Sequence, residues 1–154
     1  MTTIDMKLEA EIHQKQFRNA AHKAGVNLIY TFNWYTAKLD KVFKGEDLTM
    51  QQYNVLRILR GQHPNPASVK LIRERMLDKM SDASRIVERL RQKGFITRKE
   101  CPTDRRNVDV AITESGLAKL NALDVKVQEM EKIFSTLSES ELATLNTLLD
   151  KLRG

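Results

Sequence analysis

Short hydroxyl side chains and arginines recur between residues 81 and 93. A helix opened by Ser81 and ending at Lys93 would bury one stripe, made of Ala83, Ile86, Val87 and Leu90. Its other side would present Ser81, Ser84, Arg85, Glu88, Arg89 and Gln92. Hydroxyls and free N–H groups in a first helical turn suit phosphate, and an arginine one turn further along suits base edges. The pattern predicts a DNA recognition helix, with Ser81, Ser84, Arg85 and Arg89 as contacts.

A second group of charges lies in the polar turn at 102–106, between two segments that alternate like strands. Arg105 and Arg106 would stand near the tip of this hairpin, where Asp104 can brace one of them through a charge-assisted pair. The narrow minor groove attracts arginine through its negative potential. The hairpin therefore predicts a second DNA contact.

The positive charge of the chain is concentrated in its middle third. Residues 50–106 contain 14 Lys/Arg and 6 Asp/Glu, whereas the rest of the chain contains 12 and 14. This asymmetry favours a polyanionic partner, although a solvated basic surface would give the same count. The alternative function is a winged-helix module that docks an acidic protein without binding DNA. The arginine tip and the hydroxyl-rich helix start favour duplex DNA.

Helical periodicity dominates on both sides of this segment. Apolar residues at three- and four-residue spacing predict a helix from about Asp5 to Phe43, with a bend or break at Gly25. Capping signals predict further helices beginning after Thr49, Ser68, Thr113 and Ser138, and Gly94 occupies the position of a left-handed C-cap.

The expected fold is mainly α with a small β-hairpin wing, in a single domain covering 1–154. The winged helix-turn-helix spans 48–112, and dimerisation helices span 5–44 and 113–153. The apolar rows of the last two helices exceed what one small winged domain can cover, which predicts a homodimer. These rows are Leu117, Leu120, Leu123, Val127, Met130, Phe134, Leu142, Leu145, Leu149 and Leu152.

From about Leu48 to Leu120 the chain resembles the MarR (multiple antibiotic resistance regulator) family. The marks are Ser84-Arg85-x-Val87-x-x-Leu90-x-x-x-Gly94-Phe95-Ile96, Asp104-x-Arg106 and Thr113-Glu114-x-Gly116. The resemblance implies a homodimeric regulator, a repressor in our interpretation, joined through its terminal helices on a pseudo-palindromic operator. It also implies that Arg106 enters the minor groove while Asp104 orients it. Asp82 departs from a phosphate-binding pattern; it could cap the helix, accept a bond from a cytosine amino group, or disfavour contact.

Two aromatic residues of the first helix suggest an effector site. Tyr30 and Trp34 lie about 160° and 200° from Phe32, opposite the apolar stripe. This face could pack on the partner subunit. It could instead wall a cleft between the dimerisation helices and the winged domain, where the family resembled often binds aromatic anions. That interpretation predicts a small aromatic ligand, and we expect a carboxylate.

Other chemistry has little support. His13, His22 and His63 have no partners at metal-ligand spacing, and no nucleotide-binding or nucleophile motif occurs, so we expect no metal, cofactor or enzymatic activity. A single cysteine, Cys101, predicts a reduced cytoplasmic protein. Arg98 and Lys99 nearby could activate this thiol as a redox sensor, but a passive residue is the simpler interpretation. Neither a signal peptide nor a membrane span is expected.

Overall fold

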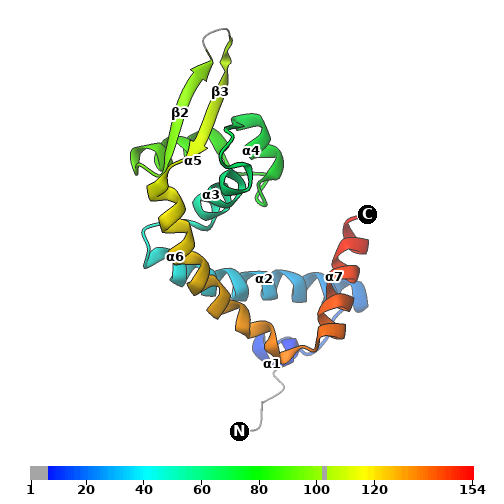
Figure 1. The fold of residues 1–154 in the computed structure, drawn as a ribbon. Coiled ribbons are helices and arrows are strands. Elements are labelled where there is room, and N and C mark those ends of the chain that lie inside the picture. Colours follow the sequence, from blue (N-terminus) through cyan, green and yellow to red (C-terminus); the bar gives the residue numbers. More distant parts are fainter. Residues whose placement is uncertain (1–6, 102–103) are drawn as a thin grey trace. The chain divides into compact units, whose positions relative to one another are not determined.

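The computed structural model describes residues 7–101 and 104–154, with only the backbone for Cys101, Arg105 and Arg106. The chain divides into two compact units, Met1–Lys38 and Leu39–Gly154. The second contains the strands and most of the helices (Figure 1).

The first unit contains α1 (Leu8–Glu11) and most of α2 (Ala20–Lys44). The predicted break at Gly25 is wrong, because α2 runs through it without interruption. An exposed glycine costs a helix about 1 kcal/mol, which a helix of 25 residues tolerates. The interruption lies instead at 12–19, where His13 adopts a left-handed φ of 54°.

The second unit begins with the last turns of α2 and continues into α3 (Met50–Gln62) and α4 (Val69–Arg75). Both predicted caps are confirmed. The Thr49 hydroxyl accepts the backbone N–H of Gln52 at 3.1 Å, and the Gln52 side chain accepts the N–H of Thr49 at 3.1 Å. The Ser68 hydroxyl accepts the N–H of Leu71 at 3.1 Å.

Helix α5 (Ala83–Gln92) starts two residues later than predicted. Its N-cap is Asp82, whose carboxylate accepts the backbone N–H of Arg85 at 3.1 Å. Ser81 lies in the turn before the helix instead, where its hydroxyl donates to the carboxylate of Asp78 at 2.7 Å. The C-terminal prediction is confirmed, since Gly94 follows the helix with a φ of +76°.

The predicted hairpin consists of β2 (Ile96–Cys101) and β3 (Asp104–Ile112), which pair antiparallel with Ile96 opposite Ile112. A short strand, β1 (Ala67–Ser68), pairs with the other edge of β3 and gives the order β1-β3-β2. Sequence reasoning missed β1, because two residues are too few for any periodicity.

Three further elements complete the chain: α6 (Glu114–Glu131), a 3-10 turn η1 (Lys132–Thr136) and α7 (Glu139–Arg153). Thr113 and Ser138 cap α6 and α7 as predicted. The core of the second unit is formed by the buried side chains Phe43, Val55, Leu56, Leu59, Ile72, Met76, Val87, Leu90, Val110, Leu120 and Leu123.

Apolar side chains also remain on the surface of both units. In α2 they are Leu28, Ile29, Phe32 and Trp34, and in α7 they are Leu145, Leu148 and Leu152. These rows coincide with the segments predicted to dimerise. Within 7–101 and 104–154, no helix combines the length and apolar character that crossing a membrane requires.

Candidate nucleic-acid interface

Burial fixes which side of α5 faces outward. Ala83, Val87 and Leu90 are at most 2% exposed and attach the helix to the core. The opposite side is therefore free, and Ser84, Arg85 and Arg89 are all on it and all exposed. The predicted polar face is confirmed as a surface, whereas its contacts with DNA stay a prediction.

A hydrogen-bonded turn precedes α5. The Asp78 carboxylate accepts the Met80 backbone N–H at 2.9 Å and the Ser81 hydroxyl at 2.7 Å. The Ser81 bond, followed by the Met80 bond, lowers the pKa of Asp78. Asn54, on α3, accepts the N–H of Leu77 at 2.9 Å. Ser81 is thus half-buried and part of the turn, which differs from the open hydroxyl that we expected.

The charged residues of α5 fall into two groups. The Glu88 carboxylate accepts two hydrogen bonds from the Arg91 guanidinium, at 2.8 and 3.0 Å, and these bonds lower the pKa of Glu88 and raise that of Arg91. Arg85 and Arg89 have no ion pair among the residues that the structure describes. These two guanidinium groups therefore remain available for an external anion.

The wing carries the second predicted contact. Asp104 is exposed and begins β3, and the backbone of Arg105 and Arg106 continues the strand. The side chains of Arg105 and Arg106 lie outside the part of the chain that the structure describes, and so does the side chain of Cys101. The bracing of Arg106 by Asp104 and the role of the thiol stay predictions.

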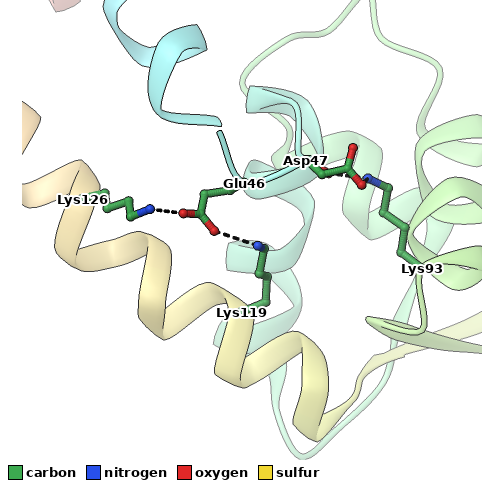
Figure 2. Close-up of polar contacts among 5 residues, drawn as sticks. All are labelled: Glu46, Asp47, Lys93, Lys119 and Lys126. Atoms are coloured by element: carbon green, nitrogen blue, oxygen red, sulfur yellow. Dashed lines mark hydrogen bonds and ion pairs between the residues drawn. The ribbon is translucent and has the colours of Figure 1, made fainter. Parts of the chain in front are cut away.

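Two adjacent acidic residues after α2 form ion pairs with lysines from other elements, as Figure 2 shows. Glu46 accepts a hydrogen bond from Nζ of Lys119 at 2.8 Å and is also paired with Lys126. These bonds, that of Lys119 first, lower the pKa of Glu46 to about 2. Asp47 accepts a bond from Nζ of Lys93 at 2.9 Å. We call these five residues the acidic clasp, because they attach both α6 and the C-cap of α5 to one loop.

A second polar network joins α3 to α6. The Tyr53 hydroxyl donates to Asp124 at 2.9 Å, and Arg60 forms an ion pair with the same carboxylate. Burial, reinforced by the bond to Asp124, raises the pKa of Tyr53 to about 12. The Tyr53 ring packs against Phe43 with centroids 4.9 Å apart. Helix α6 is therefore fixed to the winged region at two places.

Within the first unit, Tyr30 and Trp34 line one cavity of about 260 Å³, together with Leu8, Glu11, Asn27 and Thr31. Its other wall is α1 of the same chain, which neither of our interpretations foresaw. A hydrogen bond to the Glu11 carboxylate raises the pKa of Tyr30. Nζ of Lys38 lies 4.9 Å from the centroid of the Trp34 ring. The two aromatic residues are brought together as predicted, but beside an acid.

Comparison with known proteins decides the family. The sequence model of the MarR family matches residues 48–108. The transcriptional regulator PecS of Dickeya dadantii is 30% identical over 116 residues, covering 74% of this chain and 70% of PecS. The chain belongs to the MarR family. Like the other MarR regulators, it is a DNA-binding regulator of transcription.

Solved structures agree with this assignment. The chain is 31% identical to a MarR transcription factor from Planctomyces limnophilus, with a TM-score of 0.68 over 88% of this chain and 98% of the other. BpsR of Bordetella bronchiseptica gives a TM-score of 0.74 at 23% identity, over 86% and 99% of the two chains, and shows the same fold.

The MarR motifs of this chain have local structural reasons. Thr113 caps α6 and also donates to the carbonyl of Gly94 at 2.8 Å, which fixes the start of α6 to the residue that follows α5. Gly116 packs on Phe95 so closely that a Cβ would lie 2.2 Å from the Phe95 carbonyl oxygen. The acidic clasp carries no motif. Its only sequence signal is that Lys119 and Lys126 are seven residues apart, on one side of a helix.

Proposed function

We propose that this MarR regulator represses transcription by binding a pseudo-palindromic operator as a homodimer, and that it acts by binding alone, without catalysis. The outward side of α5 is the observation that supports this most directly. Arg85 and Arg89 there have no internal ion pair in the described chain, while Ala83, Val87 and Leu90 hold the helix from behind. A helix exposed in this way fits the major groove.

The side chains of α5 take different roles in this proposal. Arg85, one turn into the helix, reads base edges, while Ser84 and Arg89 contact phosphates on either side. Ser81 acts through the turn, because its hydroxyl is bonded to Asp78. At the wing, Arg105 and Arg106 enter or flank the minor groove, and Asp104 orients Arg106.

The partner subunit covers the exposed apolar rows in the proposed dimer. Leu28, Ile29 and Phe32 of α2 are between 46 and 64% exposed, and three leucines of α7 are exposed as well. Exposed apolar side chains gathered along a helix are typical of a protein interface. Dimerisation would place the two recognition helices about 34 Å apart, one turn of B-DNA. Sedimentation at micromolar concentration tests this, and a monomer contradicts it.

The cavity at Tyr30 and Trp34 is the proposed effector site. BpsR is regulated in its DNA binding by 6-hydroxynicotinic acid, which supports a small aromatic effector here. The Glu11 carboxylate changes the class of ligand that we expect, because it would repel an anionic substituent at its end of the cavity. We therefore propose an aromatic ring with a neutral hydroxyl or an amine, from which Glu11 can accept a hydrogen bond.

Selection from a random duplex pool, followed by footprinting, tests the DNA proposal. Two protected half-sites one helical turn apart are expected, with affinity that falls steeply as salt rises. The competing function is a module that docks an acidic protein. Two results together would favour that module. The selection would enrich no sequence, and duplex DNA would retain the protein no more strongly than an acidic polypeptide resin of equal charge does.

A further inference from the structure

Two large apolar side chains stand almost fully in solvent beside the recognition helix. Leu77 is 84% exposed and Met80 is 94% exposed, more than any other large apolar side chain among the described residues. Each of these side chains therefore lacks the stabilisation that burial of its apolar surface would give. Both belong to the turn that joins α4 to α5.

Their exposure does not come from a loose turn. The Leu77 N–H donates to Asn54, the Met80 N–H donates to Asp78, and the Lys79 ammonium donates to the carbonyl of Glu74. The neighbouring side chain of Met76 is 2% exposed and fills the core at this point. The backbone is thus held in a conformation that turns Met76 inward and leaves Leu77 and Met80 outside.

The position of this pair adjoins the DNA-binding surface. Met80 precedes the Asp82 cap by two residues, and Ser84 and Arg85 follow in the first turn of the helix. In helix-turn-helix modules, the start of the recognition helix lies in the major groove. The apolar group that base edges present there is the thymine methyl.

We infer that Leu77 and Met80 form an apolar part of the DNA interface and contact thymine methyl groups beside the bases read by Arg85. The inference rests on α5 entering the major groove, as proposed above. A partner subunit is less suited than DNA to contact Leu77 and Met80, because the apolar rows for dimerisation lie on α2 and α7. The pair is also interrupted by Asp78 and Lys79, which breaks up any larger apolar patch.

Deoxyuridine provides a direct probe, because it removes only the methyl group of thymine. The experiment compares an operator selected by the wild-type protein with the same operator carrying deoxyuridine at one thymine position at a time. We expect the wild-type protein to bind about fourfold more weakly for each contacted methyl that is lost. The variants L77A and M80A should bind the thymine operator more weakly than the wild-type protein does. Each variant should also lose the preference for thymine over deoxyuridine at the one position that its deleted side chain contacts.

Val125→Ala is the matched control, since Val125 is a 63% exposed apolar residue on α6. It should retain the wild-type preference for thymine, and melting temperatures should show that all three variants are folded. The inference is overturned if the wild-type protein ignores every substituted methyl, or if L77A and M80A discriminate as the wild-type protein does. If α5 does not enter the major groove at all, Arg85→Ala will leave binding to the thymine operator intact. This result distinguishes a failure of the proposed function from a failure of the thymine-methyl inference.

Discussion

The carboxylate of Asp47 lies 2.9 Å from the ammonium of Lys93, the residue that caps the C-terminus of α5. The adjacent Glu46 binds Lys119 of α6 at 2.8 Å (Figure 2). One loop thus attaches the far end of α5 and the first half of α6 together. Any change in the direction of α6 relative to this loop would act on α5, the helix that we propose to read DNA.

Acid should weaken the acidic clasp through Glu46. Its pKa lies at about 2 in the folded chain, below its ordinary value of 4.5, because Lys119 and then Lys126 bind the ionised form. The contribution of this carboxylate to stability is therefore present above about pH 4.5 and is lost as the pH falls from there toward 2. Glu46→Gln should lower the melting temperature at pH 7 but hardly at pH 2. Glu129→Gln, from an exposed pair with Lys132, is the control and should change little at any pH. A constant difference between Glu46→Gln and the wild type across this range would contradict the prediction.

Two glycines should respond in opposite directions to alanine. At Gly116 the new Cβ would meet the Phe95 carbonyl oxygen at 2.2 Å, so Gly116→Ala should destabilise the fold by about 1–3 kcal/mol. Gly25 lies inside α2, and nothing lies within 4 Å of the place that a Cβ would take, so Gly25→Ala should stabilise by about 0.5–1 kcal/mol. Urea unfolding measures both. Equal effects of the two substitutions would show that the contact at Gly116 is not tight.

The arginines of α5 should differ in their importance for DNA. Arg85→Ala should cost about 1–3 kcal/mol per half-site and relax base preference, because base readout is lost. Arg91→Ala should change affinity little, because Arg91 is bound to Glu88. Arg106→Ala should weaken binding to many sequences alike, since the minor groove is read by width and potential. Titration of each variant with one selected operator and one mutated operator gives the comparison, and an Arg106→Ala variant that binds as the wild type does would remove the wing from the interface.

Local signals made much of the fold predictable. The caps at Thr49, Ser68, Thr113 and Ser138 each depend on a side chain and a backbone N–H three residues away, so spacing alone reveals them. Gly94 was predictable from its residue type, because a left-handed residue after a helix is usually glycine.

Features that depend on distant partners were not predictable. Even one local choice stayed open, because Ser81 and Asp82 both suit an N-cap by residue type, and only the structure shows that Asp82 caps α5 while the Ser81 hydroxyl binds Asp78. Glu46 binds Lys119, which lies 73 residues away in the chain, and no periodicity in the sequence indicates such a pair. The same holds for Glu11, which lines the cavity at Tyr30 and Trp34 only because the chain folds back between α1 and α2.

The cavity on α2 yields the last prediction, because Trp34 is the only tryptophan and reports on it directly. A neutral hydroxylated or amino-substituted aromatic compound should change Trp34 fluorescence saturably and weaken operator binding over the same concentration range. A benzoate of equal size should bind more weakly, because the Glu11 carboxylate repels it. Glu11→Gln should reduce this difference by strengthening benzoate binding, whereas Glu139→Gln, an exposed acid at the start of α7, should leave it unchanged. Tighter binding of benzoate than of the neutral compound to the wild-type protein would show that Glu11 does not select the ligand. Unchanged fluorescence and operator binding with every compound would place the effector elsewhere.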